Sequence, residues 1–513
     1  MREARTIMLQ GTASDVGKSV LTAALCRIFK QDGYRVAPFK SQNMSNNSYV
    51  TPDGKEIGRA QGMQADACGI EATTDMNPIL LKPTKDMVSQ VVVHGKPYRD
   101  LDARTYRERY LPQAEAIVKE ALGRLRQRFD IVVIEGAGSP AEINLKERDI
   151  VNMRLAEWAD APVLLVADID RGGVFASIVG TLELLEPHER ERVRGVVINK
   201  FRGDVSLLQP GIDWLERRLG KPVLGVVPYL PQLGLEDEDS ASLDGKGGKG
   251  LTAVAPAGSR PIDIAVLRYP RISNFTDVDA LASEPDVRLR YVTDPREWGE
   301  PDAVVLPGSK NTAEDLLFLR ETGLEAKLLA YAERGGRIAG LCGGYQMMGL
   351  RLLDPDGVES GRSVTEALGL LPQETTFAKE KRTVRVAGSI AAGEEGTVGL
   401  PVEGYEIHMG VTVNVGSVRP LVRLRTADDP EDERPDGAVS EDGRKFGTYV
   451  HGLFDNDAFR RSWLNAIRRD KGLGPASPET AYRDGRERSF DRLAAHVRRH
   501  LDVARIYRML EGE

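Results

Sequence analysis

Short apolar runs alternate with longer amphipathic stretches over residues 6–228, and this alternation limits the possible folds more than any other feature of the chain. A helix is expected from Lys18 and another over residues 104–128. The apolar runs are rich in valine and isoleucine and are too short to be helices: TIMLQ, YRVAPF, IVVIEG, APVLLVADI, RGVVINK and VLGVVP. Strands that are apolar along their whole length are buried on both faces, as in a parallel sheet covered by helices. The sequence therefore predicts a doubly wound α/β domain.

A second series of the same kind follows a polar connection. Residues 232–260 contain six glycines, several acidic residues and almost no apolar periodicity, which is typical of an exposed link between two cores. Because 513 residues are too many for one core, we expect a first domain over 1–231 and a second α/β domain over 261–456. Residues 457–513 form an arginine-rich helical tail, which is expected to pack on the second domain.

The composition excludes several classes of protein. The net charge is −7 and basic residues are interspersed with acidic ones, so no surface for nucleic acid is expected. No stretch has the roughly 18 apolar residues of a membrane span, and the first residues lack the apolar region of a signal peptide. Three cysteines cannot form a disulfide framework. We therefore expect a cytoplasmic protein that binds neither nucleic acid nor membrane.

The first apolar run leads into a loop with the composition of a phosphate-binding loop. Glycines let such a loop wrap an anion, and its N–H groups and the N-terminus of the following helix point at phosphate. Lys18 is expected to reach the outer phosphates, and the Ser19 hydroxyl to bind magnesium. One more residue separates the two glycines than in the G-x-x-x-x-G-K-S pattern. The sequence predicts a site for ATP and Mg²⁺ with nucleotide contacts from Gly11, Thr12, Asp15, Val16, Gly17, Lys18 and Ser19.

Ala13 stands where the loop of partitioning ATPases carries a second lysine, and the loop instead resembles that of the dethiobiotin synthetase family, whose members phosphorylate a carboxylate. This resemblance implies that Lys40 in APFKSQN faces the substrate carboxylate and phosphate, and that Asn199 in VVINKFRGD belongs to an adenine-reading loop. Glu135 in IVVIEGAGSP ends a buried strand at the sheet edge where ligands bind, and a carboxylate there suits magnesium. The alternatives are a solvated strand-end turn at Glu135 and a turn-forming role for Asn199.

A strand, a sharp turn and a helix are predicted around Cys342 in RIAGLCGGYQM. Gly343 and Gly344 tolerate the strained backbone that such a turn requires. The turn exposes a nucleophile above a sheet and places the thiol at a helix N-terminus, which favours the thiolate. Cys26 and Cys68 lie in helical stretches and are expected to be small buried side chains. Cys342 is therefore the predicted nucleophile.

A nucleophilic thiol needs a base, and His451 in FGTYVHGLF ends a strand late in the same domain. His408 in EGYEIHMG is the competitor, with a structural or orienting role expected for it. The loop LPGSKNT around Gly308, together with the N–H of Gly343, is expected to form an oxyanion hole. This order of features resembles class I glutamine amidotransferases. Leu453 stands where those enzymes usually carry glutamate, so the carboxylate that orients the histidine is absent or comes from elsewhere.

Longer stretches resemble the glutamine-hydrolysing adenosylcobyric acid synthase family over nearly the whole chain to about residue 456. They include QGTASDVGKSVLTAALCRIF, VAPFKSQNMSNNSYVTPDGKEIGRAQ, EGAGSPAEINLKERDIVNM, ADIDRGGVFASIVGTLELL, LPGSKNT, LCGGYQMMG and YVHGLFD. The resemblance implies a ligase of cobalamin biosynthesis that uses ATP, Mg²⁺ and glutamine to amidate the b, d, e and g carboxylates of a corrinoid, adenosylcobyrinic acid a,c-diamide. ATP forms an acyl phosphate in such enzymes, and ammonia from glutamine displaces the phosphate.

Other functions stay open at this point. A related enzyme could amidate cobyrinic acid itself or a cell-wall lipid intermediate, although the stretch SQNMSNNS favours the corrinoid diamide. A P-loop switch protein with a degenerate second domain is the alternative of a different class. Ala13 and the intact pair of Cys342 and His451 argue against it. A homo-oligomer is compatible with the sequence.

Overall fold

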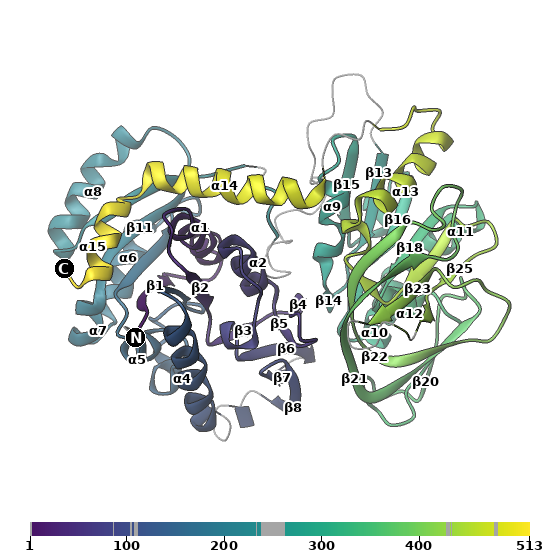
Figure 1. The fold of residues 1–513 in the computed structure, drawn as a ribbon, viewed down its shortest axis with the longest axis horizontal. Helices are drawn as coiled ribbons and strands as arrows, with labels where there is room; N and C mark the ends of the chain where they lie inside the picture. The colour runs from purple at the N-terminus through teal and green to yellow at the C-terminus, as the bar shows by residue number, and fades with distance from the viewer. Residues whose placement is uncertain are drawn as a thin grey trace.

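The computed structural model describes residues 3–85, 87–102, 105–106, 111–231, 233–236, 262–426, 431, 433–476 and 481–513. Two α/β domains lie side by side along the long axis of the molecule, and one long helix runs along the first domain and begins beside the second (Figure 1). The α/β prediction is confirmed for both domains. Most of the predicted connection between them, residues 237–260, lies outside the described residues.

The first domain is built on a parallel sheet in the order β12-β11-β10-β1-β9-β2. Its strands are β1 (Arg5–Gly11), β2 (Val36–Phe39), β9 (Ile131–Glu135), β10 (Val163–Asp168), β11 (Val193–Phe201) and β12 (Val223–Pro228). The helices around it are α1 (Lys18–Gln31), α2 (Arg59–Cys68), α4 (Leu111–Arg128), α5 (Met153–Ala159), α6 (Val174–Glu183), α7 (Pro187–Arg192) and α8 (Val205–Leu219). Because side chains on both faces of these strands are buried, polar groups are confined to the strand ends.

A smaller β-layer lies between this sheet and the second domain (Figure 1). It consists of a four-stranded sheet, β3 (Gln42–Met44), β6 (Ile79–Lys85), β7 (Val88–Val93) and β8 (Lys96–Asp102), and of a hairpin, β4 (Ser48–Val50) and β5 (Glu56–Gly58). The sequence analysis did not predict this layer. β3, β4 and β5 have only three residues each, too few to show a period, and polar residues interrupt β6, β7 and β8.

The second domain contains a central sheet in the order β15-β13-β16-β18-β26-β25, parallel except for the last strand. Its strands are β13 (Ile262–Leu267), β15 (Val287–Val292), β16 (Ala303–Leu306), β18 (Arg337–Leu341), β25 (Ala438–Val439) and β26 (Lys445–Thr448). Its helices are α9 (Asp279–Ala282), α10 (Thr312–Thr322), α11 (Leu324–Glu333), α12 (Gly343–Met347) and α13 (Asp457–Asp470).

A second, largely antiparallel sheet packs in the same domain around the long hairpin of β21 and β22. Its strands are β19 (Arg351–Leu353), β20 (Val364–Glu366), β21 (Gln373–Ile390), β22 (Pro401–Asn414), β23 (Val422–Thr426), β24 (Arg434–Asp436) and β27 (Val450–His451). A short ladder of β14 (Ile272–Ser273) and β17 (Gly308–Ser309) completes the domain.

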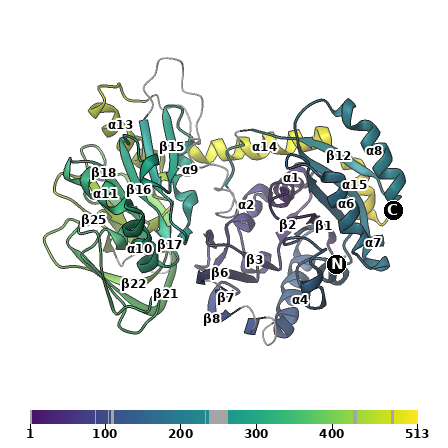
Figure 2. The same cartoon turned by 180° about the vertical axis from the view of Figure 1, so that it is seen from behind.

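The C-terminal tail is divided between the two domains. Helix α13 packs in the core of the second domain through Phe459 and Trp463. In contrast, α14 (Tyr482–His500) and α15 (Val503–Glu511) pack on the first domain, where Phe490 joins the core beneath α1 (Figure 2). Arg27 of α1 pairs with Asp491 of α14 at 2.8 Å. The expectation that the tail packs on the second domain is therefore wrong for α14 and α15, because amphipathic spacing identifies an apolar face but not its partner.

The connection between the domains was expected to be exposed, but one of its described residues is buried. Glu236 is buried and forms ion pairs with Arg59 at 3.1 Å and with Arg486 at 2.8 Å. Burial alone would raise the pKa of Glu236, but the two guanidinium groups lower it to about 2. This part of the connection is held against α2 and α14 rather than exposed.

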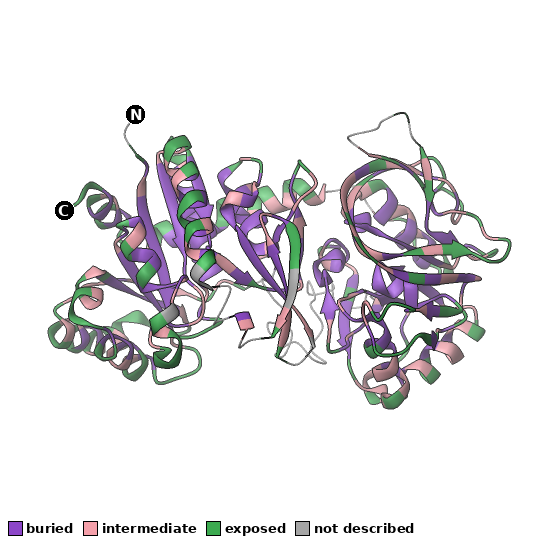
Figure 3. Ribbon diagram, turned by 90° about the horizontal axis from the view of Figure 1, so that it is seen from below, coloured by how far each residue is buried: buried purple, intermediate pink, exposed green. Residues whose placement is uncertain are grey.

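Burial follows the layers of the fold. The strands of both central sheets are buried almost throughout, and exposed residues gather on the outer faces of helices and on loops (Figure 3). Among the described residues, no helix is long and apolar enough to cross a membrane.

The contact between β12 and the chain after α14 gives a test of this arrangement. Gly225 forms a bridge with Leu501, and a methyl group at Gly225 would lie 1.9 Å from the carbonyl oxygen of His500. Gly225→Ala is expected to lower the free energy of unfolding by about 1–3 kcal/mol, because backbone must move to admit the methyl group. Chemical denaturation measures this change.

Gly123→Ala is the matched control, since no atom lies within 4 Å of the added methyl group on α4. Alanine in place of glycine within a helix stabilises it by about 0.5–1 kcal/mol. Equal stability of the two variants would contradict the docking of the tail on β12.

Candidate functional site

The predicted phosphate loop connects β1 to α1. Gly11 ends the strand, and the Thr12 N–H donates to the Val166 carbonyl at 2.9 Å. Asp15 and Gly17 have positive φ values of 56° and 95°, which turn the chain sharply into the helix. Glycine tolerates that conformation, and aspartate adopts it more readily than most residues. The strand, loop and helix around Lys18 therefore have the arrangement that the motif requires.

Polar side chains from α1, α2, β9 and the residue after β2 meet behind this loop. The Ser19 hydroxyl donates to Glu135 Oε1 at 2.8 Å, and Lys40 Nζ lies 2.9 Å from the same oxygen. Glu135 Oε2 accepts from Gln64 Nε2 at 2.6 Å. Lys18 Nζ donates to the carbonyls of Ala13 and Gly138, at 2.9 and 3.1 Å.

The structure thus brings Ser19, Lys40 and Glu135 together at the carboxyl ends of β2 and β9. Glu135 is completely buried and paired, so the alternative of a solvated turn is wrong. Sequence reasoning missed Gln64, because a glutamine inside a helix gives no signal of its contact with a strand end.

Asn199 lies against the phosphate loop near the end of β11. Its Nδ2 donates to the Val16 carbonyl at 2.8 Å, and the neighbouring Lys200 pairs with Asp168 at 3.0 Å and donates to the Asp15 carbonyl. A methyl group at Gly17 would lie 2.3 Å from Asn199 Nδ2, so glycine is required for this contact. Asn199 therefore holds the loop from its position in β11, two residues before the strand ends.

A cavity of about 870 Å³ adjoins these residues. Gly138, whose carbonyl accepts the Lys18 hydrogen bond, lies in its wall. The wall is largely apolar, with Met44, Leu81 and Val91 from the small β-layer. Arg271 lines it from the second domain. A bulky, partly apolar molecule could therefore lie beside the phosphate loop.

Cys342 occupies a sharp turn between β18 and α12, as predicted. Its φ of 50° and ψ of −109° are strained for a residue with a side chain, and such strain is typical of functional sites. A methyl group at Gly344 would lie 2.0 Å from the Leu306 carbonyl oxygen, so the elbow packs too tightly for any larger residue. The side chain is buried, and its Sγ lies 3.5 Å from the Ile407 carbonyl.

His451 is completely buried and faces the Cys342 thiol. Its Nδ1 lies 2.7 Å from Asp277 Oδ2, and Asp277 Oδ1 accepts from the Gly452 N–H at 3.0 Å. Burial alone would lower the pKa of His451, but the charges of Asp277 and Cys342 raise it to about 10. Cysteine, histidine and aspartate therefore have the arrangement of a triad that generates a thiolate.

Asp277 supplies the carboxylate that Leu453 cannot. It lies in a short 3-10 helix, Phe275–Val278, directly after β14 and far from His451 in the sequence. Sequence reasoning missed it because the segment NFTD has neither helical nor strand periodicity. Its one signal was an acidic residue just beyond the first strand of the domain.

The remaining predicted residues of this domain lie close to the elbow. His408 hydrogen-bonds the Gly410 carbonyl at 3.2 Å and stacks on Tyr449 at 3.7 Å, and burial lowers its pKa to about 4. It is therefore neutral near pH 7 and has a packing role. Gly308 lies in β17, and a methyl group at Gly343 would lie 2.7 Å from the Ser309 nitrogen. The loop and the elbow are thus adjacent, as an oxyanion hole requires.

The fold and the two sites define a class of protein in which a nucleotide-binding domain is joined to a glutamine amidotransferase domain. Residues 7–242 match the model of the CobQ/CobB/MinD/ParA nucleotide binding domain, and residues 263–459 match that of the CobB/CobQ-like glutamine amidotransferase domain.

Comparison with full-length relatives identifies the family within this class. A cobyric acid synthase of Geobacillus kaustophilus is 52% identical over 99% of this chain and 98% of its own length. Proteins of the same name from Desulforamulus reducens and Yersinia enterocolitica are 53% and 52% identical, over 99% of this chain and 99% and 98% of their own. The chain belongs to the cobyric acid synthase family. A non-enzymatic switch is therefore not favoured.

The contact between Asp277 and His451 generates a prediction. Asp277→Asn removes the charge that raises the pKa of His451, so burial then lowers that pKa. The imidazolium is lost as the pH rises through the lowered pKa, and the thiolate loses its counter-ion near neutral pH. Glutamine hydrolysis is expected to fall by about 10²–10⁴. Release of glutamate measures it.

Asp294→Asn is the control, since Asp294 pairs with Arg296 on the surface of the same domain. It should hydrolyse glutamine like the unaltered protein. A folded Asp277→Asn variant with unchanged hydrolysis would exclude Asp277 from the triad.

Proposed function

We propose that this protein uses ATP and glutamine to convert the b, d, e and g carboxylates of adenosylcobyrinic acid a,c-diamide to carboxamides, giving adenosylcobyric acid. The observation that carries the proposal is the presence in one chain of a phosphate loop with the Ser19–Glu135–Lys40 cluster and of a Cys342–His451–Asp277 triad. The first site activates a carboxylate, and the second releases ammonia. We place these activities in residues 1–231 and 261–456.

In the first step, a carboxylate oxygen of the corrinoid attacks the γ-phosphorus of ATP, so an acyl phosphate forms and ADP leaves. Lys18 neutralises charge on the transferring phosphate from its position over the loop. Lys40 holds the attacking carboxylate beside that phosphate. Phosphoryl transfer depends mainly on positioning and charge, and Lys18 lies at the end of the loop while Lys40 lies at the end of β2, beside Glu135.

Magnesium suits the oxygen donors present in this site. Among the described residues, no three His, Cys, Asp or Glu side chains gather into a metal site. The Ser19 hydroxyl and Glu135 carboxylate together offer oxygen ligands, and magnesium usually completes its shell with water and substrate phosphates. When bound there, the ion would balance the charge of the nucleotide phosphates. Lys40, whose Nζ lies 2.9 Å from Glu135 Oε1, would hold the substrate carboxylate beside them.

The cavity beside Gly138 is the proposed place for the corrinoid. Its apolar walls fit the ring, and a carboxylate on the ring edge can reach the phosphates over Lys18. Lys146 and Arg271 in the wall provide cations for the other carboxylates. Four edge positions are amidated in turn, so a roomy site in which the ring can be rebound is more suitable than a close-fitting one.

In the second site, the Cys342 thiolate attacks the glutamine amide carbon. The tetrahedral oxyanion is held by N–H groups of the Gly308 loop and Gly343. His451 donates a proton to the leaving nitrogen, ammonia departs, and water hydrolyses the thioester to glutamate. Ammonia then attacks the acyl phosphate carbon, and inorganic phosphate leaves as the amide forms.

The separation of the two chemistries is testable at Cys342. Cys342→Ala is expected to abolish glutamine-dependent amidation, because alanine cannot form the thioester, while ammonium salt at alkaline pH restores ATP-dependent amidation. Mass spectrometry of the corrinoid product counts the amides added with each nitrogen source. Cys26→Ala is the matched control, since Cys26 is a buried thiol in α1. A folded Cys342→Ala variant that ammonia does not rescue would contradict the division of labour.

Lys18→Ala is expected to impair amidation and to spare glutamine hydrolysis, the reverse of Cys342→Ala. Amidation should fall by about 10²-fold or more with either nitrogen source, because the transferring phosphate loses a fixed positive charge. Glutamine hydrolysis without ATP should persist. Lys119→Ala serves as the control, since Lys119 forms a surface pair with Glu115 on α4. Amide formation by Lys18→Ala at the unaltered rate would remove ATP activation from this loop.

A further inference from the structure

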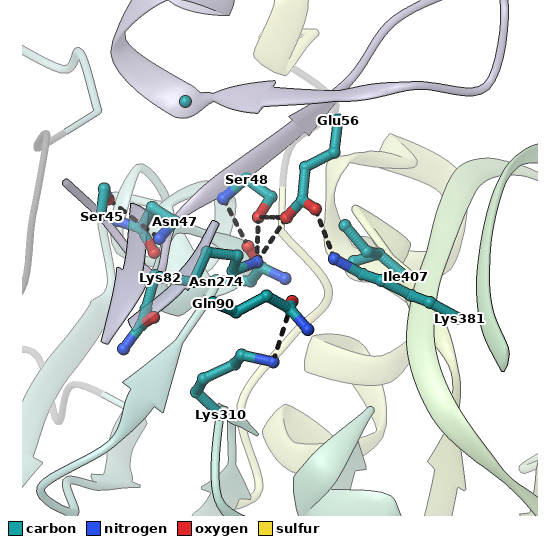
Figure 4. A network of polar contacts seen from close by, with 12 residues as sticks. Ser45, Asn47, Ser48, Glu56, Lys82, Gln90, Asn274, Lys310, Lys381 and Ile407 are labelled. Atoms are coloured by element: carbon teal, nitrogen blue, oxygen red, sulfur yellow. Dashed lines mark hydrogen bonds and ion pairs between the residues drawn. The ribbon is translucent and has the colours of Figure 1, made fainter. Parts of the chain in front are cut away.

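Each domain contributes an asparagine whose side-chain oxygen accepts a hydrogen bond from the backbone of the other domain, and the Asn274–Ser48 bond is drawn in Figure 4. Asn274 Oδ1, in the second domain, accepts from the Ser48 N–H of the first at 2.8 Å. Asn47 Oδ1, in the first domain, accepts from the Phe275 N–H of the second at 3.2 Å. Asn47, Ser48 and Asn274 are each at most 3% exposed, so these bonds are shielded from water. Each domain therefore fixes backbone of the other.

The Ser48 N–H determines the orientation of the Asn274 amide. A backbone N–H can only donate, so the atom that faces it must be the amide oxygen. The amide nitrogen then lies 3.2 Å from Nε2 of His451. Because an NH₂ group also only donates, this contact is a hydrogen bond when Nε2 is unprotonated and accepts. In that state the proton of the ring lies on Nδ1, which donates to Asp277.

This orientation opposes the catalytic proton transfer. When Nε2 takes the proton of Cys342, its new N–H can donate to the thiolate, but the NH₂ group of Asn274 loses its acceptor and meets a second donor in a buried place. A buried donor without an acceptor is costly. If the amide turned over, its oxygen would accept from Nε2–H and stabilise the imidazolium. The amide therefore favours a neutral or a charged His451, depending on which way it faces.

The segment that holds the amide begins in the nucleotide site. Lys40 contacts Glu135, and Gln42 and Met44 line the cavity proposed for the corrinoid. Four residues beyond Met44, the Ser48 hydroxyl donates to Glu56 at 2.5 Å and accepts from Lys82 at 2.6 Å (Figure 4). The Ser48 N–H is thus separated from the cavity wall at Met44 by only a short stretch of chain.

Glu56 anchors this segment to the second domain as well. It pairs with Lys82 of its own domain and with Lys381 of β21 (Figure 4). Burial alone would raise the pKa of Glu56, but the two ammonium groups hold it well below its usual range. The charge of Glu56 therefore holds the hairpin of β4 and β5, which contains Ser48, against β21.

We propose that Asn274 is a positioning residue that couples the two active sites. While the Ser48 N–H holds its oxygen, its NH₂ group disfavours the imidazolium of His451 and so opposes formation of the Cys342 thiolate. Filling of the nucleotide site and cavity shifts the segment from Lys40 to Ser48, the amide turns over, and glutamine hydrolysis accelerates. Ammonia is then released fastest when a carboxylate is ready to receive it. This inference rests on the proposed function.

Other groups around His451 set the background for this effect. Asp277 favours the imidazolium, as does a charged Cys342, whereas His408 disfavours it when protonated. The ring of His451 stacks on Tyr405 at 5.0 Å, and the Tyr405 hydroxyl donates to the Ser48 carbonyl at 3.2 Å. Two further charged groups lie near Tyr405. Arg59 belongs to the first domain, and Asp455 belongs to the 3-10 helix that follows β27.

The test measures the thiolate of Cys342 directly. The rate of iodoacetamide alkylation of Cys342, located by peptide mass spectrometry, is followed against pH in the full-length protein without ligands. Asn274→Asp presents only oxygens to Ser48 and His451, and Asn274→Gly removes the amide without adding charge. Both residues suit the φ of 48° at this position better than most. Each variant should reach half-maximal alkylation at least about one pH unit lower, a tenfold change in thiolate–imidazolium population.

The same variants should hydrolyse glutamine faster than the unaltered protein when ATP and corrinoid are absent. A non-hydrolysable ATP analogue with Mg²⁺ and the corrinoid diamide should shift the alkylation profile of the unaltered protein in the same direction. Arg385→Met is the matched control, because Arg385 donates to the Val50 carbonyl at 2.7 Å in the same interface and has no role at either site. Its profile should match that of the unaltered protein.

Three results would overturn the inference. Coincident profiles for both Asn274 variants and the unaltered protein would show that the amide does not oppose the thiolate. An equal shift of the alkylation profile in Arg385→Met would mean that the strength of the domain contact, not the orientation of the amide, controls the reactivity of Cys342. A shift in Asn274→Asp without one in Asn274→Gly would mean that the added charge alone acts. None of these measurements requires amide formation, so failure of the proposed function is recognised separately, by the absence of amidated product with ammonia.

Discussion

Burial of both faces of the parallel sheets is the constraint on which both sites depend. Strands such as β1, β9 and β18 have no face on which a polar side chain could meet water, so polar groups are confined to the strand ends. Glu135 is the last residue of β9, and Cys342 directly follows β18. The two domains differ in chemistry, yet both place it at the carboxyl edge of a parallel sheet, where the helices begin.

Much of each site was predictable because its residues lie in segments with a local pattern. A strand, a glycine-rich loop and a helix identify Lys18 and Ser19, and a glycine-flanked elbow identifies Cys342. The spacing of strands was enough to place Glu135 and His451 at strand ends. The α/β class of both domains followed from the same apolar runs, since a continuous apolar strand has few ways to be covered.

The residues that were not predicted owe their position to contacts between distant segments. Asp277 reaches His451 from a short 3-10 helix, and Gln64 reaches Glu135 from inside α2. Neither position differs from its neighbours in periodicity. The docking of α14 on α1 was missed for a related reason, because an amphipathic helix shows only that one face is buried. Ion pairs such as that of Arg27 with Asp491 then select which surface receives it.

The return of α14 and α15 to the first domain has a consequence for synthesis of the chain. About 250 residues separate the end of β12 at Pro228 from the start of α14 at Tyr482. At about 5–20 residues per second, a ribosome needs roughly 13–50 s to make them. During that time the apolar surface of α1 that later contacts Phe490 has no cover. The first domain to emerge is thus the last to be completed, and the amidotransferase domain must fold while its neighbour is still open.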